Sequence, residues 1–127
     1  MPISIYNITI DILMVEYLDI GLVFYFVSTL DEMIKLVSII HSNVGNSRYT
    51  AIFRHDGKEK RVNFGDKRYE NYTTHRDTER KKQYLLRHVK NEDWTNPMSS
   101  GALSRWILWN LPGFNASVKA YKRMFGV

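Results

Sequence analysis

Four histidines and one mid-chain serine are the residues whose types could support acid–base or nucleophilic chemistry. The histidines are His41, His55, His75 and His88, and no two of them are four residues apart, the spacing that places two metal ligands on one helical face. Ser104 lacks the glycine-rich turn that exposes a serine nucleophile. We therefore predict no catalytic residue and do not expect an enzyme.

Metal and cofactor chemistry also has little support in the sequence. His75, Asp77 and Glu79 alternate along the chain and could in principle hold a metal ion, but they stand at an expected helix start, where a capping carboxylate is the simpler interpretation. The chain has no cysteine, which excludes disulfides, cysteine-ligated zinc and iron–sulfur clusters. It also has no glycine-rich phosphate loop. We predict no metal site and no cofactor.

Charge is distributed very unevenly along the 127 residues. Residues 1–34 contain five acids and no Lys or Arg, so they carry −5. Residues 35–127 contain all 18 basic residues and the other 8 acids, so they carry +10. This division predicts an acidic, apolar N-terminal arm (1–34) and a basic domain (35–127). A basic domain can bind nucleic acid, an anionic membrane face or an acidic protein, and it can also be a solvated surface, which is the commoner case.

The best candidates for binding lie in the stretch 67–90, which is both basic and aromatic. The candidate interface or anion-contact residues are Arg76, Arg80, Lys81, Lys82, Arg87 and Lys90. Such side chains neutralise phosphates or pair with acidic protein surfaces, although here they surround most of a predicted helix instead of forming one stripe. Trp94 and Trp109 are the candidate aromatic anchors for an interface.

The elements that position these residues are three strands followed by three helices. Alternating runs over residues 35–42, 48–54 and 59–64 predict strands, and Asp56-Gly57 between the last two predicts a hairpin. Residues 66–77 have no helical period and are predicted as a loop. Helices are expected at about 78–91, 101–110 and 115–125, beginning at Asp77, at Ser99 or Ser100, and at Asn115. The predicted fold is α+β, an antiparallel meander followed by three packed C-terminal helices.

The first thirty residues are unusually apolar. Residues 3–12 alternate in the manner of a strand, and residues 20–30 form an apolar run. That run is shorter than the roughly 20 residues of a membrane-spanning helix. We favour a strand or helix packed on the body, with a membrane-associated segment as the alternative. Met33 stands where the composition changes and is an alternative start of the protein.

A series of short motifs gives the second half of the chain a recognisable signature. The motifs are Phe64-Gly65, Tyr69 to Thr73, His75-Arg76-Asp77, Glu79-Arg80, Tyr84-Leu85, Arg87-His88, Trp94 to Pro97, Gly101 to Trp109 and Tyr121 to Phe125. Through them, residues 48–126 resemble a small family of proteins from nucleocytoplasmic large DNA viruses, such as the chlorella viruses and iridoviruses. The resemblance assigns no catalytic residues.

The resemblance implies a virion-associated protein. We expect a minor capsid protein that lies in the icosahedral shell and bridges larger components, with the major capsid protein and other minor capsid proteins as its partners. Two alternatives remain open. One is a DNA-binding virion protein that uses the six basic residues named above, and the other is a capsid protein linked to the inner viral membrane through residues 20–30.

Overall fold

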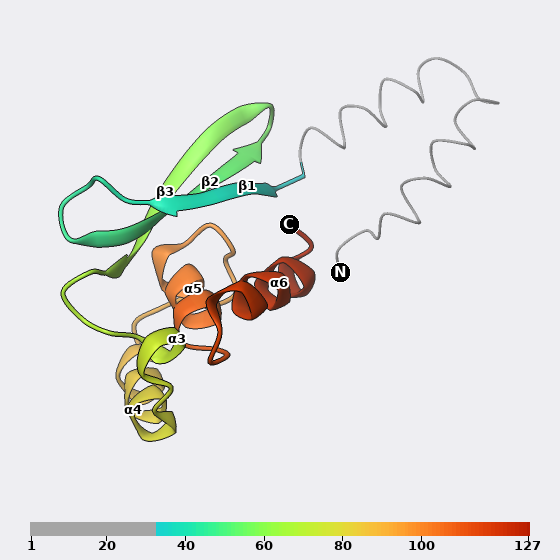
Figure 1. The fold of residues 1–127 in the computed structure, drawn as a ribbon. Helices are drawn as coiled ribbons and strands as arrows, with labels where there is room; N and C mark the ends of the chain where they lie inside the picture. The colour runs from blue at the N-terminus through green and yellow to red at the C-terminus, as the bar shows by residue number, and fades with distance from the viewer. Residues whose placement is uncertain (1–32) are drawn as a thin grey trace, which may run out of the picture.

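The computed structural model describes residues 33–127, in which a three-stranded sheet is followed by a group of helices (Figure 1). The strands β1 (Lys35–His41), β2 (Ser47–His55) and β3 (Lys58–Asp66) pair antiparallel in the order β1-β2-β3. The predicted α+β class and the predicted meander are both confirmed.

The hairpin between β2 and β3 forms where the Asp-Gly pair predicted it. Asp56 and Gly57 both have positive φ, 53° and 70°, as a tight two-residue turn between twisted strands requires. The turn sets the register that pairs Tyr49 with Phe64 and Phe53 with Lys60. Because side chains alternate along a strand, this register directs Phe53 and Phe64 to the same side of the sheet, where both are buried.

The helical half begins earlier than the sequence suggested. A one-turn helix, α3 (Tyr72–His75), lies within the stretch predicted as a loop. Asn71 caps it, since its side chain accepts from the Thr73 backbone N–H while the Thr74 hydroxyl accepts from the Asn71 N–H. The prediction of a loop was wrong here because reciprocal capping, not apolar period, stabilises so short a helix.

The next helix, α4 (Thr78–His88), begins at the Asp77 cap as predicted but ends three residues before Asn91. The predicted helix 101–110 is divided into α5 (Ser100–Leu103) and a π-helical turn, η1 (Ser104–Leu108). Ser99 caps α5, so the first of the two predicted caps is confirmed. The wide turn of η1 is closed by the hydrogen bond from the Trp109 N–H to the Ser104 carbonyl, 3.1 Å long.

The last helix, α6 (Phe114–Phe125), ends at Gly126 in the left-handed conformation. Its N-cap is Gly113, which has no side chain to accept a hydrogen bond, and Asn115 lies inside the first turn. The prediction of an Asn115 cap was therefore wrong. The Ser117 hydroxyl accepts from the Leu111 N–H and so ties the first turns of α6 to the segment that precedes the helix.

The core lies between the sheet and the segment that contains α5, η1 and α6. Its fully buried side chains include Phe53, Phe64, Leu103, Ile107 and Tyr121. The Tyr121 hydroxyl donates to the Pro97 carbonyl at 2.5 Å, which satisfies the one polar atom of this buried ring. Figure 1 shows α5 and α6 beneath the sheet, whereas α4 lies at the end of the molecule away from it.

Most of the predicted N-terminal arm lies outside the described residues, including the strand predicted at 3–12 and the apolar run 20–30. Ile34, the last residue of that arm, packs against the core. Within residues 33–127, no helix has both the length and the apolar character needed to cross a membrane.

At Gly65 the end of β3 lies close against η1. Its φ is +76°, and a Cβ there would lie 2.7 Å from Leu108 Cδ1 and 3.2 Å from Arg48 Cβ. We predict that Gly65→Ala lowers the free energy of unfolding by about 2–4 kcal/mol, from backbone strain and overpacking together. Gly57→Ala is the matched control, since its φ is +70° and nothing lies within 4 Å. Urea denaturation should show the larger loss for Gly65→Ala, and equal losses would contradict the packing argument.

Candidate functional site

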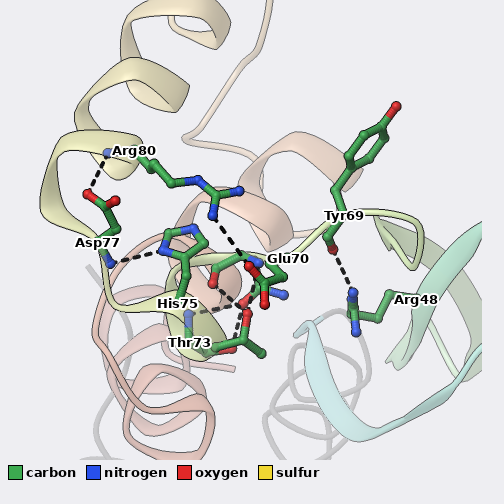
Figure 2. A network of polar contacts seen from close by, with 9 residues as sticks. Arg48, Tyr69, Glu70, Thr73, His75, Asp77 and Arg80 are labelled. Carbon is green, nitrogen blue, oxygen red and sulfur yellow. Dashed lines mark hydrogen bonds and ion pairs between the residues drawn. The ribbon is translucent and has the colours of Figure 1, made fainter.

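Two of the six predicted basic residues form polar contacts with other residues of the domain. The Arg80 guanidinium reaches from α4 to the Glu70 carboxylate at 3.4 Å, as Figure 2 shows. Lys81 Nζ donates to the Asn110 carbonyl at 2.6 Å and lies 4.9 Å from the centre of the Tyr72 ring. Burial lowers the pKa of Lys81 below its ordinary value. Lys81 is therefore poorly suited to contact an external anion, whereas Arg80 stays on the surface and its ion pair with Glu70 is exposed.

The other four basic residues are exposed. Within the described part of the chain, Arg76, Lys82, Arg87 and Lys90 form no ion pair with a carboxylate. Arg76 stands apart in the left-handed turn that ends α3, with φ 55°. The structure therefore separates the two members held by contacts of their side chains from these four.

The junction of α3 and α4 is fixed by a network of short-range hydrogen bonds (Figure 2). His75 Nδ1 accepts from the Asp77 N–H at 2.9 Å, while Asp77 Oδ1 accepts from the N–H groups of Glu79 and Arg80. The remaining ring nitrogen, Nε2, is buried and has no partner among the described residues. His75 and Asp77 thus act in capping, and no group of histidine and acidic side chains in residues 33–127 is arranged to hold a metal ion.

Trp109 holds α4 against the rest of the helical half. Its ring stacks on Tyr84 with centroids 4.2 Å apart and planes 4° from parallel, and the Tyr84 ring also stacks on His88 at 4.1 Å. The Trp109 carbonyl accepts from Arg105 Nη1 at 3.0 Å, within the same π-helical region. Burial raises the pKa of Tyr84 far above its ordinary value, so its hydroxyl stays protonated. Trp109 is half-buried in this stack.

Trp94, the other predicted anchor, also forms contacts with residues of its own domain. Its Nε1 donates to Glu92 Oε2 at 2.9 Å, and its carbonyl accepts from Trp106 Nε1 at 2.9 Å. The Arg105 guanidinium lies 4.1 Å from the Trp106 ring centre and 5.4 Å from that of Trp94. These contacts give Trp94 a clear part in joining the end of α4 to α5 and η1.

A pocket of about 580 Å³ lies between α4, the segment after β3, and the start of α5. Glu92 Oε1 accepts from His88 Nδ1 at 2.5 Å, so with Trp94 on Oε2 both carboxylate oxygens are occupied. Because Gly101 has no side chain, it leaves room for the Glu92 carboxylate. A Cβ at that position would lie 2.7 Å from Glu92 Oε2. The pairing leaves His88 Nε2 as the ring nitrogen available to a proton or a ligand. Sequence reasoning missed Glu92, although its spacing of four from His88 was a visible signal.

Sequence reasoning named Lys82 and Lys90 but missed that Leu86 and Val89 are exposed beside them, on the outer face of α4 and the turn that follows it. The spacing of four residues between Leu85 and Val89 is typical of an apolar stripe on a helix. In the structure Leu86 is 57% exposed and Val89 51% exposed, whereas Tyr84 and His88 face inward. The apolar residues of α4 thus cover more of the helix than the body can bury.

Comparisons with known proteins give one match. A family model described as a family of unknown function, DUF5754, matches residues 37–88. The matched region contains nearly all of the sheet together with α3 and α4, and it stops before Glu92 and Trp94. No curated protein and no solved structure matches the chain.

Protonation of His75 should weaken the fold. Burial, followed by the nearby Arg80 charge, lowers its pKa below the ordinary 6.5, so the unfolded state binds the proton more tightly. Above about pH 6.5, neutral His75 makes its full contribution to the free energy of unfolding. That contribution is lost as the pH falls through the lower pKa that His75 has in the folded state. We expect His75→Asn, whose amide oxygen can still accept from Asp77, to show a shallower fall in unfolding free energy below pH 6.5. Parallel urea-derived curves for both proteins would contradict this assignment.

Glu92 should matter for stability more than an exposed glutamate does. Glu92→Ala leaves the buried side of His88 and the Trp94 indole N–H without their acceptor, at an expected cost of about 1–3 kcal/mol. Glu59→Ala removes a carboxylate that pairs with Arg61 on the exposed hairpin, and it should cost less than about 1 kcal/mol. Urea denaturation followed by tryptophan fluorescence compares the two, and similar losses would argue against a structural role for Glu92.

Proposed function

We propose that this chain is a structural assembly protein, a minor capsid protein that bridges larger components in the shell of a large DNA virus. The resemblance of residues 48–126 supports the viral setting. The major capsid protein and other minor capsid proteins are the proposed partners. The observation that carries the bridging role is the presence of two exposed apolar surfaces in separate parts of one small domain.

The first surface is the outer face of α4, with Leu86 and Val89 exposed between Lys82 and Lys90. The second lies on β1, a strand at one edge of the sheet, where Val37 is 53% exposed and Ile40 43% exposed. An edge strand also presents unpaired backbone groups along its free side. Figure 1 shows the sheet and α4 at different ends of the described molecule.

A bridging protein needs such a pair of surfaces joined by a part that does not deform. Here the join is the buried core on which Trp109 packs, formed by Phe53, Phe64, Leu103, Ile107 and Tyr121. The stack of Trp109 on Tyr84 then connects α4 to that core. Each surface alone is small, and modest contacts repeated by the symmetry of a shell provide avidity without one tight site. This arrangement supports assembly more than it supports catalysis.

DNA binding is the second candidate, because Arg76, Lys82, Arg87 and Lys90 are exposed cations without an ion pair among residues 33–127. It receives less support than assembly. Lys81 donates to the Asn110 carbonyl, and Arg80 is already paired with Glu70 at the surface. Phosphate contacts also leave the exposed side chains of Leu86 and Val89 without a function. A membrane link through residues 20–30 concerns a segment outside the described residues.

The test is fractionation of purified virions into shell, membrane and DNA core, with quantitative mass spectrometry of this chain's peptides. We expect enrichment in the shell together with the major capsid protein, and lower incorporation for Val37→Ser/Ile40→Ser and for Leu86→Ser/Val89→Ser. Lys119→Ser, an exposed change on α6, is the control and should be incorporated normally. Enrichment with the DNA core would favour the second candidate, and absence from virions would overturn the assembly role.

A further inference from the structure

A groove of about 410 Å³ runs beside α4 on the side of α3. It is lined by Tyr72, Thr78, Lys81, Lys82, Leu85 and Leu86. Residues three and four apart are neighbours on a helix surface, so Leu85 and Leu86 are followed along the same side by Val89. The groove and this apolar ridge form one continuous feature, about two turns long, that the described chain leaves open.

The charge around the ridge is positive. Between residues 78 and 90 there are five basic residues and one acid, a net charge of +4. The acid is Glu79, whose carboxylate accepts from Gln83 Nε2 at 3.3 Å. Within residues 33–127, neither Lys82 nor Lys90 pairs with a carboxylate. An apolar ridge with a free ammonium group near each end is complementary to a surface that is apolar along its middle and acidic at its flanks.

Building on the proposed assembly function, we propose that this groove docks an acidic amphipathic helix of a partner protein. Leucine-sized side chains of the partner pack on Leu85, Leu86 and Val89, in the manner of a helix lying in a groove. Its carboxylates pair with Lys82 within α4 and with Lys90 in the turn that follows the helix. The partner therefore carries acidic residues seven or eight positions apart, one near each end of an apolar stripe.

The same charges argue against α4 of a second copy of this chain as the occupant. If two α4 helices met side by side in parallel, Lys82 would face Lys82 of the second copy. If they met antiparallel, Lys82 would face Lys90 of the second copy. Like charges brought together at a desolvated contact are unfavourable in both arrangements, so the complementary partner is a different, acidic helix.

The probe is a synthetic amphipathic peptide with a leucine stripe and glutamates seven residues apart, titrated into the full-length, isotope-labelled chain and followed by NMR. Two control peptides keep parts of its chemistry: one replaces each Glu by Lys, and one has the same composition in scrambled order. We expect the acidic peptide to shift amide signals from Leu85 to Lys90. The lysine peptide and the scrambled peptide should leave those signals unchanged.

Variants of the full chain identify the surface. Leu86→Ser/Val89→Ser and Lys82→Glu/Lys90→Glu should each weaken binding of the acidic peptide about tenfold or more. The control, Val37→Ser/Ile40→Ser, removes equally exposed apolar side chains from β1 and should leave the affinity unchanged. Circular dichroism verifies that each variant is folded before the comparison.

Three outcomes would overturn the proposal: no shift in the α4 signals with the acidic peptide, equal binding by the scrambled peptide, or equal binding by Leu86→Ser/Val89→Ser. Tighter binding of a short DNA duplex or of phosphatidylserine vesicles at the same residues would also overturn it. The proposed function fails separately. If the chain binds the peptide but is absent from the virion shell, the capsid role alone is refuted. If the chain is present in the shell but does not bind the peptide, this inference alone is refuted.

Discussion

The stacking of Trp109 on Tyr84 is the contact on which the arrangement of the helical half depends. The two rings lie almost parallel at 4.2 Å, and parallel aromatic contacts of this kind add to the free energy already gained by burying the rings. Together with Lys81, whose ammonium group donates to Asn110, the stack holds α4 to the region just after η1. The remaining anchors of α4, including the Arg80–Glu70 ion pair, are exposed and contribute less.

Because α4 is held mainly along the side that carries Tyr84 and His88, its other side is left free for a partner. Within residues 33–127, no further layer covers Leu86 and Val89, and both side chains are more than half exposed. The same stack places His88 beside Glu92 and forms one wall of the pocket. The pocket and the exposed face of α4 therefore both result from the stacking of Trp109 on Tyr84.

Sequence patterns predicted the strands and helices more accurately than they predicted which residues of those elements are exposed. The Asp56-Gly57 turn and the Asp77 cap were readable because each depends on residues adjacent in the chain. The π-helical turn could not be predicted from the sequence. Its hydrogen bond from Trp109 to Ser104 replaces an α-helical bond, and no particular residue type marks that replacement. Among the six basic candidates, only tertiary contacts distinguish engaged Lys81 and Arg80 from the other four.

By itself the sequence determined the α+β class, the meander, the order of helices and the absence of cysteine chemistry. Period, turn residues and capping are local properties, and a short stretch of chain is enough to express them. Tertiary structure decided which side of α4 faces inward, that Glu92 orients His88, and that Leu86 and Val89 remain exposed. Burial depends on which distant residues come together, here Trp109 and Tyr84, and no local pattern contains that information.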